Sequence, residues 1–235
     1  IDVSRMVRRP GPENQTMLVN VRQETGEHIF SWVAVDCPPL EVSELDREYI
    51  TSAEFLHLDG CHAQAALQAA QWMHAAGKRV MLDGSATRGP ISPAMRALVC
   101  AANIVICGTG FGPALTGKRD LWEVGQEMLA MGPEIVVQTE GEDGSYTVTK
   151  DERFHTPAFK VEVVDTTGAG DVFHGAYLVG LLHGWDLRSI ALFSTAVSAL
   201  KCTQLSGRRG IPTFHQTVSY LQQQNISLSP DRLTT

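Results

Sequence analysis

The sequence predicts an α/β protein in which a parallel sheet is covered by helices on both faces. From Glu54 onward, apolar segments of strand length alternate with amphipathic segments of helix length. Such alternation indicates βαβ units, whose crossovers place helices over both faces of a sheet. The 235 residues, 43% hydrophobic and 19% charged, suffice for one sizeable α/β domain, or for a domain with a small appendage.

The opening of the chain predicts two strands around a turn. Residues 15–22 and 28–35 alternate in a way that suggests one exposed face, and they flank the polar stretch 23–27. The chain begins at Ile1, without a methionine, and we expect further residues ahead of it.

The strand and helix segments follow in a regular order. The predicted strands are 54–59, 79–84, 103–108 and 134–139; the first three precede predicted helices 63–77, 92–102 and 119–132. The fourth leads into a hairpin-like stretch, 141–164, whose last residues, 161–164, are predicted to form a buried strand. A helix with Phe173, Ala176 and Tyr177 on one stripe comes next, followed by helices over 186–203 and 214–225.

Charge and cysteine usage limit the partners. A formal net charge of −7 works against a broad nucleic-acid surface, so a bound phosphate must be held by local geometry or by a metal ion. No apolar run approaches the length of a membrane span. The five cysteines are scattered without metal-site spacing, which suits reduced, core-filling thiols in a cytoplasm: Cys37, Cys61, Cys100, Cys107 and Cys202.

Four loops are expected at one edge of the sheet. Ligands of open α/β sheets bind beyond the carboxyl ends of the strands. In this sequence those ends carry Asp83, Gly108, Thr139 and Asp165.

The richest of these loops is DTTGAGD, residues 165–171. Gly168 and Gly170 permit backbone angles that a side chain would obstruct, so the N–H groups of Gly168, Ala169 and Gly170 can point into one concavity at the start of a helix. We therefore predict an anion cradle here.

The carboxylates of this loop have two interpretations each. Asp171 would repel a bound phosphate unless it served the reaction, for instance by taking a proton from an attacking hydroxyl. The alternative is that it caps the helix. Asp165 and Thr167 are either turn residues or oxygen ligands for a cation.

The stretch resembles the D-T-x-G-A-G-D signature of the ribokinase-like, or PfkB, carbohydrate kinases. The resemblance implies a three-layer αβα, Rossmann-like sheet with a small β lid. It also implies that Asp171 is the general base and that Gly168 to Gly170 form the anion hole for the transferred phosphoryl group. Residues 1–35 would then belong to the lid, which often mediates dimers, and 36–235 to the nucleotide-binding core.

Three further segments carry the resemblance. QTEGEDGSY resembles the family's nucleotide loop, which implies that Thr139, Gly141 and Gly144 lie at the phosphates and ribose of ATP; a plain hairpin turn is the alternative. LFSTAVSALKCT resembles the helix beside the adenine, with Thr195 near the base. KCTQLSGRRGIP resembles a loop whose backbone carbonyls, together with Asp165 and Thr167, hold a monovalent cation such as K⁺ in ribokinase.

The sequence also departs from the family pattern. Gly108 and Phe111 replace the asparagine and glutamate of an N-x-x-E element, so Mg²⁺ would be held mainly by nucleotide phosphates and water. Gly210 stands where ribokinase has a serine near the cation. Several sequence segments resemble those of bacterial ketose-type kinases, including 6-deoxy-6-sulfofructose kinase. Cys61, however, falls where the sulfonate-binding arginine of that enzyme is expected.

The segment NIVICGTGFG offers a different class, a dinucleotide-binding dehydrogenase. Pro113 stands where the third glycine of that fingerprint belongs, and Glu127 falls inside a predicted helix. We therefore expect an ATP-dependent kinase that phosphorylates a hydroxyl of a pentose, hexose or ketose-type sugar. A nucleoside kinase of the same fold and a non-catalytic nucleotide or sugar binder are the alternatives.

Overall fold

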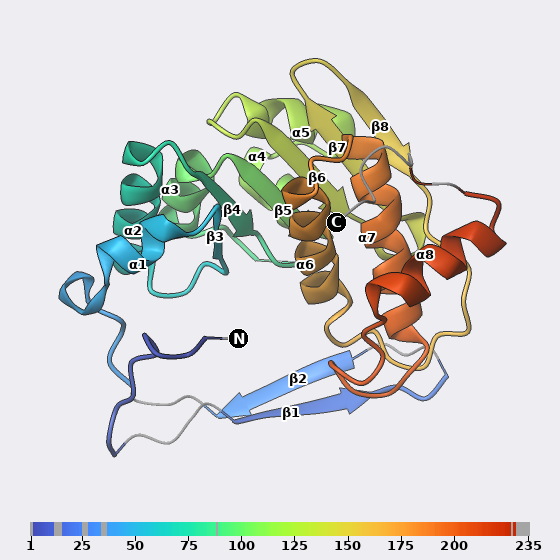
Figure 1. Ribbon diagram of the computed structural model, residues 1–235, viewed down its shortest axis with the longest axis horizontal. Coiled ribbons are helices and arrows are strands. Elements are labelled where there is room, and N and C mark those ends of the chain that lie inside the picture. Colours follow the sequence, from blue (N-terminus) through green and yellow to red (C-terminus); the bar gives the residue numbers. More distant parts are fainter. Residues whose placement is uncertain are drawn as a thin grey trace.

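The computed structural model describes residues 2–11, 16–24, 28–33, 37–87, 89–226 and 228. Its main sheet has the strand order β3-β4-β5-β6-β7-β8, with helices on both faces (Figure 1). The strands are β3 (Phe55–Leu58), β4 (Arg79–Asp83), β5 (Ile104–Gly108), β6 (Ile135–Thr139), β7 (Ser145–Thr149) and β8 (Arg153–Thr156). The helices are α1 (Arg47–Ser52), α2 (Ala63–Ala75), α3 (Pro93–Ala101), α4 (Phe111–Thr116), α5 (Leu121–Leu129), α6 (Ala169–Leu182), α7 (Leu187–Cys202) and α8 (Phe214–Gln223), with 3₁₀ turns η1 (Val42–Glu44) and η2 (Gly141–Asp143).

The sheet is mixed. Strands β3 to β6 run parallel, as the strand–helix alternation predicts, whereas β7 and β8 are antiparallel additions at one edge. The α/β prediction is therefore confirmed, and the hairpin-like sequence after β6 accounts for the two antiparallel strands.

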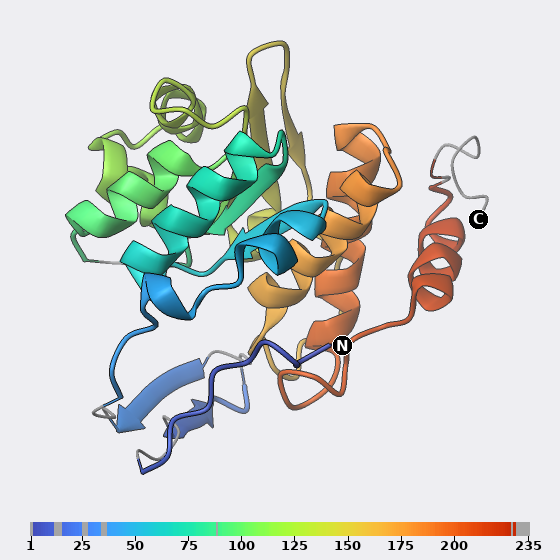
Figure 2. The ribbon, with the colours of Figure 1, turned by 60° about the vertical axis from the view of Figure 1, so that its left-hand side comes forward.

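Alternate residues of the central strands face opposite helical layers. In β5, Ile104 and Ile106 belong to the core cluster shared with α6, α7 and α8. Val105 and Cys107 belong to the cluster shared with α2, α3, α4 and α5. A continuous apolar run such as IVIC is typical of a strand covered on both faces, because each face needs its own apolar set. Figures 1 and 2 show the two helical layers on either side of the sheet.

The predicted hairpin at the start of the chain is confirmed as a separate two-stranded sheet. Strands β1 (Thr16–Val21) and β2 (His28–Val33) pair antiparallel and lie apart from the main sheet (Figures 1 and 2). Several of its apolar side chains are exposed, namely Met17, Leu18 and Ile29. The turn residues 25–27 and residues 34–36 lie outside the described part.

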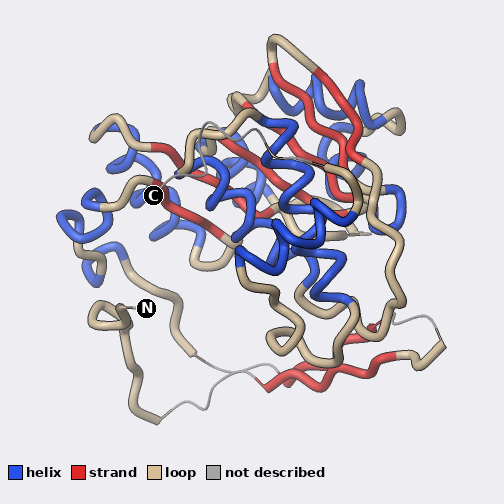
Figure 3. The backbone as a smooth tube through the Cα atoms, turned by 45° about the vertical axis from the view of Figure 1, so that its right-hand side comes forward, coloured by secondary structure: helices blue, strands red, loops and turns tan. Residues whose placement is uncertain are grey.

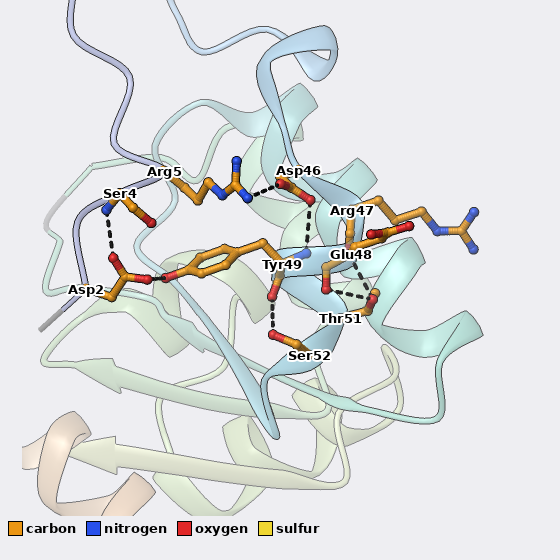
Figure 4. Close-up of polar contacts among 9 residues, drawn as sticks. All are labelled: Asp2, Ser4, Arg5, Asp46, Arg47, Glu48, Tyr49, Thr51 and Ser52. Atoms are coloured by element: carbon orange, nitrogen blue, oxygen red, sulfur yellow. Dashed lines mark hydrogen bonds and ion pairs between the residues drawn. The ribbon is translucent and has the colours of Figure 1, made fainter.

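The segment ahead of the hairpin contacts the main body of the protein at α1 (Figure 4). Asp46 caps α1 by accepting a hydrogen bond from Tyr49 N at 3.0 Å, and Arg5 lies 3.2 Å from its carboxylate. Tyr49 OH in turn donates to Asp2 at 3.2 Å. These contacts are largely exposed, so water screens the charges that take part in them. Helix α1 was not predicted from the sequence.

The strand predicted for residues 161–164 is wrong. Val163 and Val164 are 42% and 40% exposed, and the segment has no strand partner in the described chain. The N–H groups of Val164 and Asp165 both donate to the carbonyl of Cys202, at 2.8 and 3.2 Å. The end of α7, rather than a neighbouring strand, therefore accepts the N–H groups at the end of this segment.

The cysteines divide into two groups. Cys107 and Cys202 are buried as expected, but the core-filling interpretation is wrong for Cys37, Cys61 and Cys100, which are exposed. All are free thiols. Of the helices that the structure describes, none has the length and apolarity needed to span a bilayer.

Candidate active site

Three of the four predicted loop residues meet at one edge of the sheet. Asp83, Gly108 and Thr139 end the parallel strands β4, β5 and β6, and Gly108 is in register with Thr139. This part of the prediction is confirmed. Asp165 does not follow a strand, so the DTTGAGD loop must reach this edge by another route. Figure 3, which is coloured by secondary structure, shows the strands of the main sheet in red with helices in blue around them.

Helix α6 brings the loop there. His174 is buried in the middle of the helix, and its Nδ1 lies 3.3 Å from the carboxylate of Asp83 and 3.4 Å from Nε2 of His57 in β3. Burial, and then the charge of His57, lower the pKa of His174 to about 4, while Asp171 acts in the opposite direction. Asp171 therefore lies close to the strand ends, one helical turn before His174.

The start of α6 requires glycine at residue 168. Gly168 is the N-cap residue with φ of +79°, and a Cβ there would lie 3.0 Å from the carbonyl oxygen of Gly207. Gly170 has ordinary helical angles, and a Cβ on it would meet nothing within 4 Å. The helix start thus faces open space at Gly170.

Two of the three predicted cradle N–H groups are available. Ala169 N donates to the carbonyl of Thr166 at 3.0 Å. Among the described residues, none accepts a hydrogen bond from the N–H of Gly168 or Gly170. The first N–H groups of a helix lack partners inside the helix and carry its positive dipole end, which suits an anion.

Asp171 does not cap α6. The N-cap position belongs to Gly168, so Asp171 is the third residue of the first turn, where a carboxylate is favoured by the helix dipole. One of its oxygens, Oδ2, lies 3.5 Å from the position of a Cβ at Gly168. The carboxylate therefore stands directly beside the predicted cradle.

Asp165 organises the loop from inside. It is 2% exposed, and its two carboxylate oxygens accept N–H bonds from Thr167 and Ser206, both at 2.8 Å. Burial acts to raise the pKa of Asp165, but the Thr167 side chain, then these two N–H bonds and the charge of Lys201, lower it below its usual value. The Thr167 hydroxyl oxygen is buried without a geometric hydrogen-bond partner in the described chain.

Helix α7 holds the same loop from the other side. Lys201 Nζ donates to the main-chain oxygen of Asp165 at 2.7 Å, and Ser198 Oγ donates to that of Ala169 at 2.9 Å. Sequence reasoning missed both residues. The available signal for Lys201 was a lysine inside the otherwise apolar stretch of α7.

The predicted nucleotide loop is the turn between β6 and β7. A Cβ on Gly144 would lie 2.1 Å from the carbonyl oxygen of Thr156, so packing alone requires this glycine. Gly141 has φ of +56° and faces open space. Thr139 ends β6, and its hydroxyl donates to the carbonyl of Cys107 at 3.3 Å. The geometry fits both a nucleotide loop and the plain turn.

Thr195 lies in α7 and is buried. Its hydroxyl donates to the carbonyl of Ala191 at 2.8 Å, within the helix. Its hydroxyl proton is thus already engaged, so Thr195 would meet a neighbouring base mainly through packing.

The dinucleotide-like segment has a packing explanation. A Cβ on Gly110 would lie 2.2 Å from the carbonyl oxygen of Thr87, and Gly110 has φ of +86°. Pro113 lies inside α4, and Glu127 inside α5 rather than at a strand end. These residues form no ribose-binding arrangement of the dehydrogenase kind.

The pfkB family carbohydrate kinase model matches residues 1–213. The chain belongs to the pfkB family of carbohydrate kinases. Its ribokinase-like fold agrees with solved structures: ribokinase from Thermotoga maritima superposes with a TM-score of 0.78 at 24% identity, over 92% of this chain and 72% of that one.

Two curated relatives match this chain over a smaller share of their own length. The 5-dehydro-2-deoxygluconokinase of Shouchella clausii is 29% identical over 206 residues, which cover 80% of this chain and 62% of the relative. The ribokinase of Bacillus subtilis is 34% identical over 95 residues, 40% of this chain and 32% of the relative. The chain thus spans less than two thirds of the length of these curated relatives.

A structure of an Escherichia coli protein described as a ribokinase II, in complex with ATP and Mg²⁺, has a TM-score of 0.75 at 21% identity. The superposition covers 84% of this chain and 68% of the E. coli chain. At this identity the similarity establishes the fold.

Proposed function

We propose that the protein is an ATP-dependent sugar kinase that transfers the γ-phosphoryl group to a hydroxyl of a pentose, hexose or ketose-type sugar. The observation that carries the proposal is the start of α6. It places the carboxylate of Asp171 at the carboxyl edge of the parallel strands, beside the N–H groups of Gly168 and Gly170, which donate to no acceptor among the described residues. Family membership supports the same reaction class.

The residues divide the chemistry between them. Asp171 takes the proton from the acceptor hydroxyl as its oxygen attacks phosphorus. The N–H groups of the loop 168–170 and the helix dipole stabilise the negative charge on the transferred phosphoryl group. Because the donors are fixed by α6, they need no reorganisation during the reaction.

The nucleotide lies between the β6–β7 turn and α7. In this proposal Thr139, Gly141 and Gly144 line the phosphates and ribose, and Thr195 packs near the base. The ATP complex of the E. coli ribokinase II supports ATP as the donor.

Mg²⁺ fits through the nucleotide rather than through a protein cage. Within the described residues, no three His, Cys, Asp or Glu side chains form a metal-binding group. Mg²⁺ often keeps several waters and binds through substrate phosphates, where it neutralises phosphate charge. The open space before Gly170 leaves room for such a complex.

Two cations could serve the Asp165 loop. The resemblance raised K⁺ at Asp165 and Thr167, whose buried hydroxyl has no partner in hydrogen-bond geometry in the described chain. The ammonium of Lys201 is the other cation, and it already contacts this loop. A K⁺ titration of turnover distinguishes them.

The remaining parts of the proposal concern the whole protein. Residues 1–35 form part of a lid over the sugar, 36–235 form the nucleotide-binding core, and the lid supplies a homodimer contact. The exposed apolar side chains of β1 and β2 support a covering role. The free thiols support a reducing, cytoplasmic location.

The test is turnover by the full-length protein with Mg²⁺-ATP and a panel of sugars, sugar acids and nucleosides, followed as ADP release. Sugar-dependent ADP release at rates of about 1–100 s⁻¹, usual for kinases, is the expected result. Turnover with nucleosides alone would identify a nucleoside kinase instead. ATP binding without turnover of any acceptor would identify a non-catalytic binder.

A further inference from the structure

Lys201 is a fully buried cation at the base of the DTTGAGD loop. It is 0% exposed, in the last turn of α7. Lysine is almost never fully buried unless it is paired, because removing its charge from water is costly. A lysine retained in such a position therefore needs a compensating interaction, and its surroundings show which one it has.

The compensation comes from Asp165. Nζ of Lys201 donates to the main-chain oxygen of Asp165 at 2.7 Å, and the charge of Lys201 acts on the buried Asp165 carboxylate. That carboxylate in turn accepts the N–H groups of Thr167 and Ser206. A buried positive charge thus lies near a buried negative charge where the loop begins.

The same end of α7 fixes the backbone on both sides of this contact. Cys202 O accepts the N–H groups of Val164 and Asp165, and Ser198 Oγ donates to Ala169 O at 2.9 Å. Between these anchors lies the segment that presents the N–H groups of Gly168 and Gly170. Displacement of Asp165 would therefore move the predicted cradle.

The residues fit a bound K⁺ poorly. Both carboxylate oxygens of Asp165 accept N–H bonds, and its main-chain oxygen accepts Lys201. A Cβ on Gly210 would lie 2.3 Å from Lys201 O, so the present backbone excludes a serine ligand there. Of the expected side-chain ligands, only the Thr167 hydroxyl has no partner in hydrogen-bond geometry in the described chain, and it too acts on the Asp165 carboxylate by lowering the pKa of that group.

We propose that the ammonium of Lys201 is the built-in cation of this loop. It neutralises Asp165 and holds residues 164–168 so that the N–H groups of Gly168 and Gly170 face the transferred phosphoryl group. Phosphoryl transfer then needs no added K⁺. This inference rests on the proposed kinase function for its kinetic consequences, and it makes Lys201 a positioning residue.

The experiment combines a cation titration with one substitution. Turnover of the full-length wild-type protein is measured with Mg²⁺-ATP in tetramethylammonium chloride and with K⁺ added at constant ionic strength. Lys201→Met keeps the chain length and removes the charge; Lys78→Met is the matched control, because Lys78 forms a surface ion pair with Glu54. Amide hydrogen exchange of residues 164–170 is followed in all three proteins.

The turnover rate of the wild-type protein is expected to change by less than about twofold when K⁺ is added. Lys201→Met should lose about 100-fold in kcat, with KM for ATP within about threefold, because misplaced donors weaken transition-state stabilisation more than ground-state binding. Its 164–170 amides should exchange faster. Lys78→Met should match the wild type in each measurement.

Activation of the wild type by K⁺ of more than about fivefold would overturn the inference, even if Lys201→Met failed to fold. So would a folded Lys201→Met protein with wild-type kcat and unchanged exchange. If the wild type turned over no acceptor in any salt, the proposed function would fail, while the exchange of residues 164–170 in the two variants would still decide whether Lys201 holds the loop.

Discussion

At the position of Asp171, the helix dipole stabilises a carboxylate, but an anion bound at the helix start would repel it. The first turn of α6 favours negative charge by about 0.3–1 kcal/mol, but the same turn offers its N–H groups to an anion beside that carboxylate. A simple helix cap would sit at residue 168, where the chain has glycine. The placement is therefore better explained by proton transfer than by capping.

Replacing Asp171 by Asn tests this role. The amide keeps the shape but cannot accept the hydroxyl proton, so kcat should fall by about 10² to 10⁴. ATP affinity should be nearly unchanged, since the base contributes to the transition state rather than to ground-state binding. Steady-state kinetics and nucleotide titration measure both quantities. A loss of kcat below about tenfold would leave Asp171 without a catalytic part.

Gly170 gives a second residue-level prediction. A Cβ at Gly170 or at Gly175 would meet nothing within 4 Å, and both glycines lie in α6. Gly170→Ala and Gly175→Ala should therefore both fold, each with a gain of up to about 1 kcal/mol in helix propensity. Only Gly170→Ala places a methyl group at the predicted cradle, and it should lose about 3 to 4 kcal/mol of transition-state stabilisation.

The comparison of kcat between these two variants is decisive, because their thermal stabilities should match. Equal activity of the two would argue against an anion cradle at Gly170. Gly110, in the dinucleotide-like segment, is a poor control: its added Cβ would lie 2.2 Å from Thr87 O, so an alanine there would disturb the fold itself.

At the scale of the element, α6 joins the loop to the sheet through a buried histidine. His174 is held neutral, with its pKa lowered to about 4 by burial and then by His57, against the opposing effect of Asp171. It contacts Asp83, whose own pKa is raised by burial. The helix therefore carries a titratable contact directly beneath the proposed site.

This contact predicts an acid-sensitive stability. A histidine whose pKa is lowered in the folded state takes up its proton first in the unfolded state. Stability is therefore complete above about pH 6.5 and falls as the pH decreases toward about 4, by up to about 3 kcal/mol. Protonation of Asp83 in the folded protein opposes part of this loss at the lower end.

Thermal unfolding at pH 7.5 and pH 5.0 checks the prediction. His174→Asn removes the titrating ring and should show a smaller decrease in Tm than the wild type. His215→Asn, at an exposed position in α8, should keep the wild-type difference. An equal pH response in all three proteins would show that His174 does not govern it.

Across the molecule as a whole, the kinase and dehydrogenase interpretations place the nucleotide at different sites. The proposed donor site lies between the β6–β7 turn and α7, whereas a dinucleotide would sit at the end of β5. Mg²⁺ with a non-hydrolysable ATP analogue should slow amide exchange in residues 139–144, in α7 around Thr195 and at Gly168 to Gly170. Residues 108–112 should be unaffected.

Hydrogen exchange with mass spectrometry measures this pattern, with NAD⁺ as the matched control ligand. NAD⁺ should protect none of these segments. Protection by either ligand confined to residues 108–112 would contradict the kinase proposal and restore the dehydrogenase alternative.

The helical layers and one edge of the site could be predicted from local patterns in the chain. The apolar run at Ile104–Cys107 needs cover on both faces, and the carboxyl ends of parallel strands coincide, so Asp83, Gly108 and Thr139 had to lie together. The DTTGAGD spacing likewise identified the glycine-rich helix start, because only a few residue types suit a positive φ beside unpaired N–H groups.

The contacts that hold this site could not be predicted in this way, because they join residues far apart in the chain. His57 and His174 meet across 117 positions of sequence, and Lys201 meets Asp165 across 36. The segment 161–164 looked like a strand, but its exposure and its bonds to Cys202 depend on where α7 ends. Local patterns report what a segment prefers, whereas burial and hydrogen-bond partners depend on elements that only folding brings together.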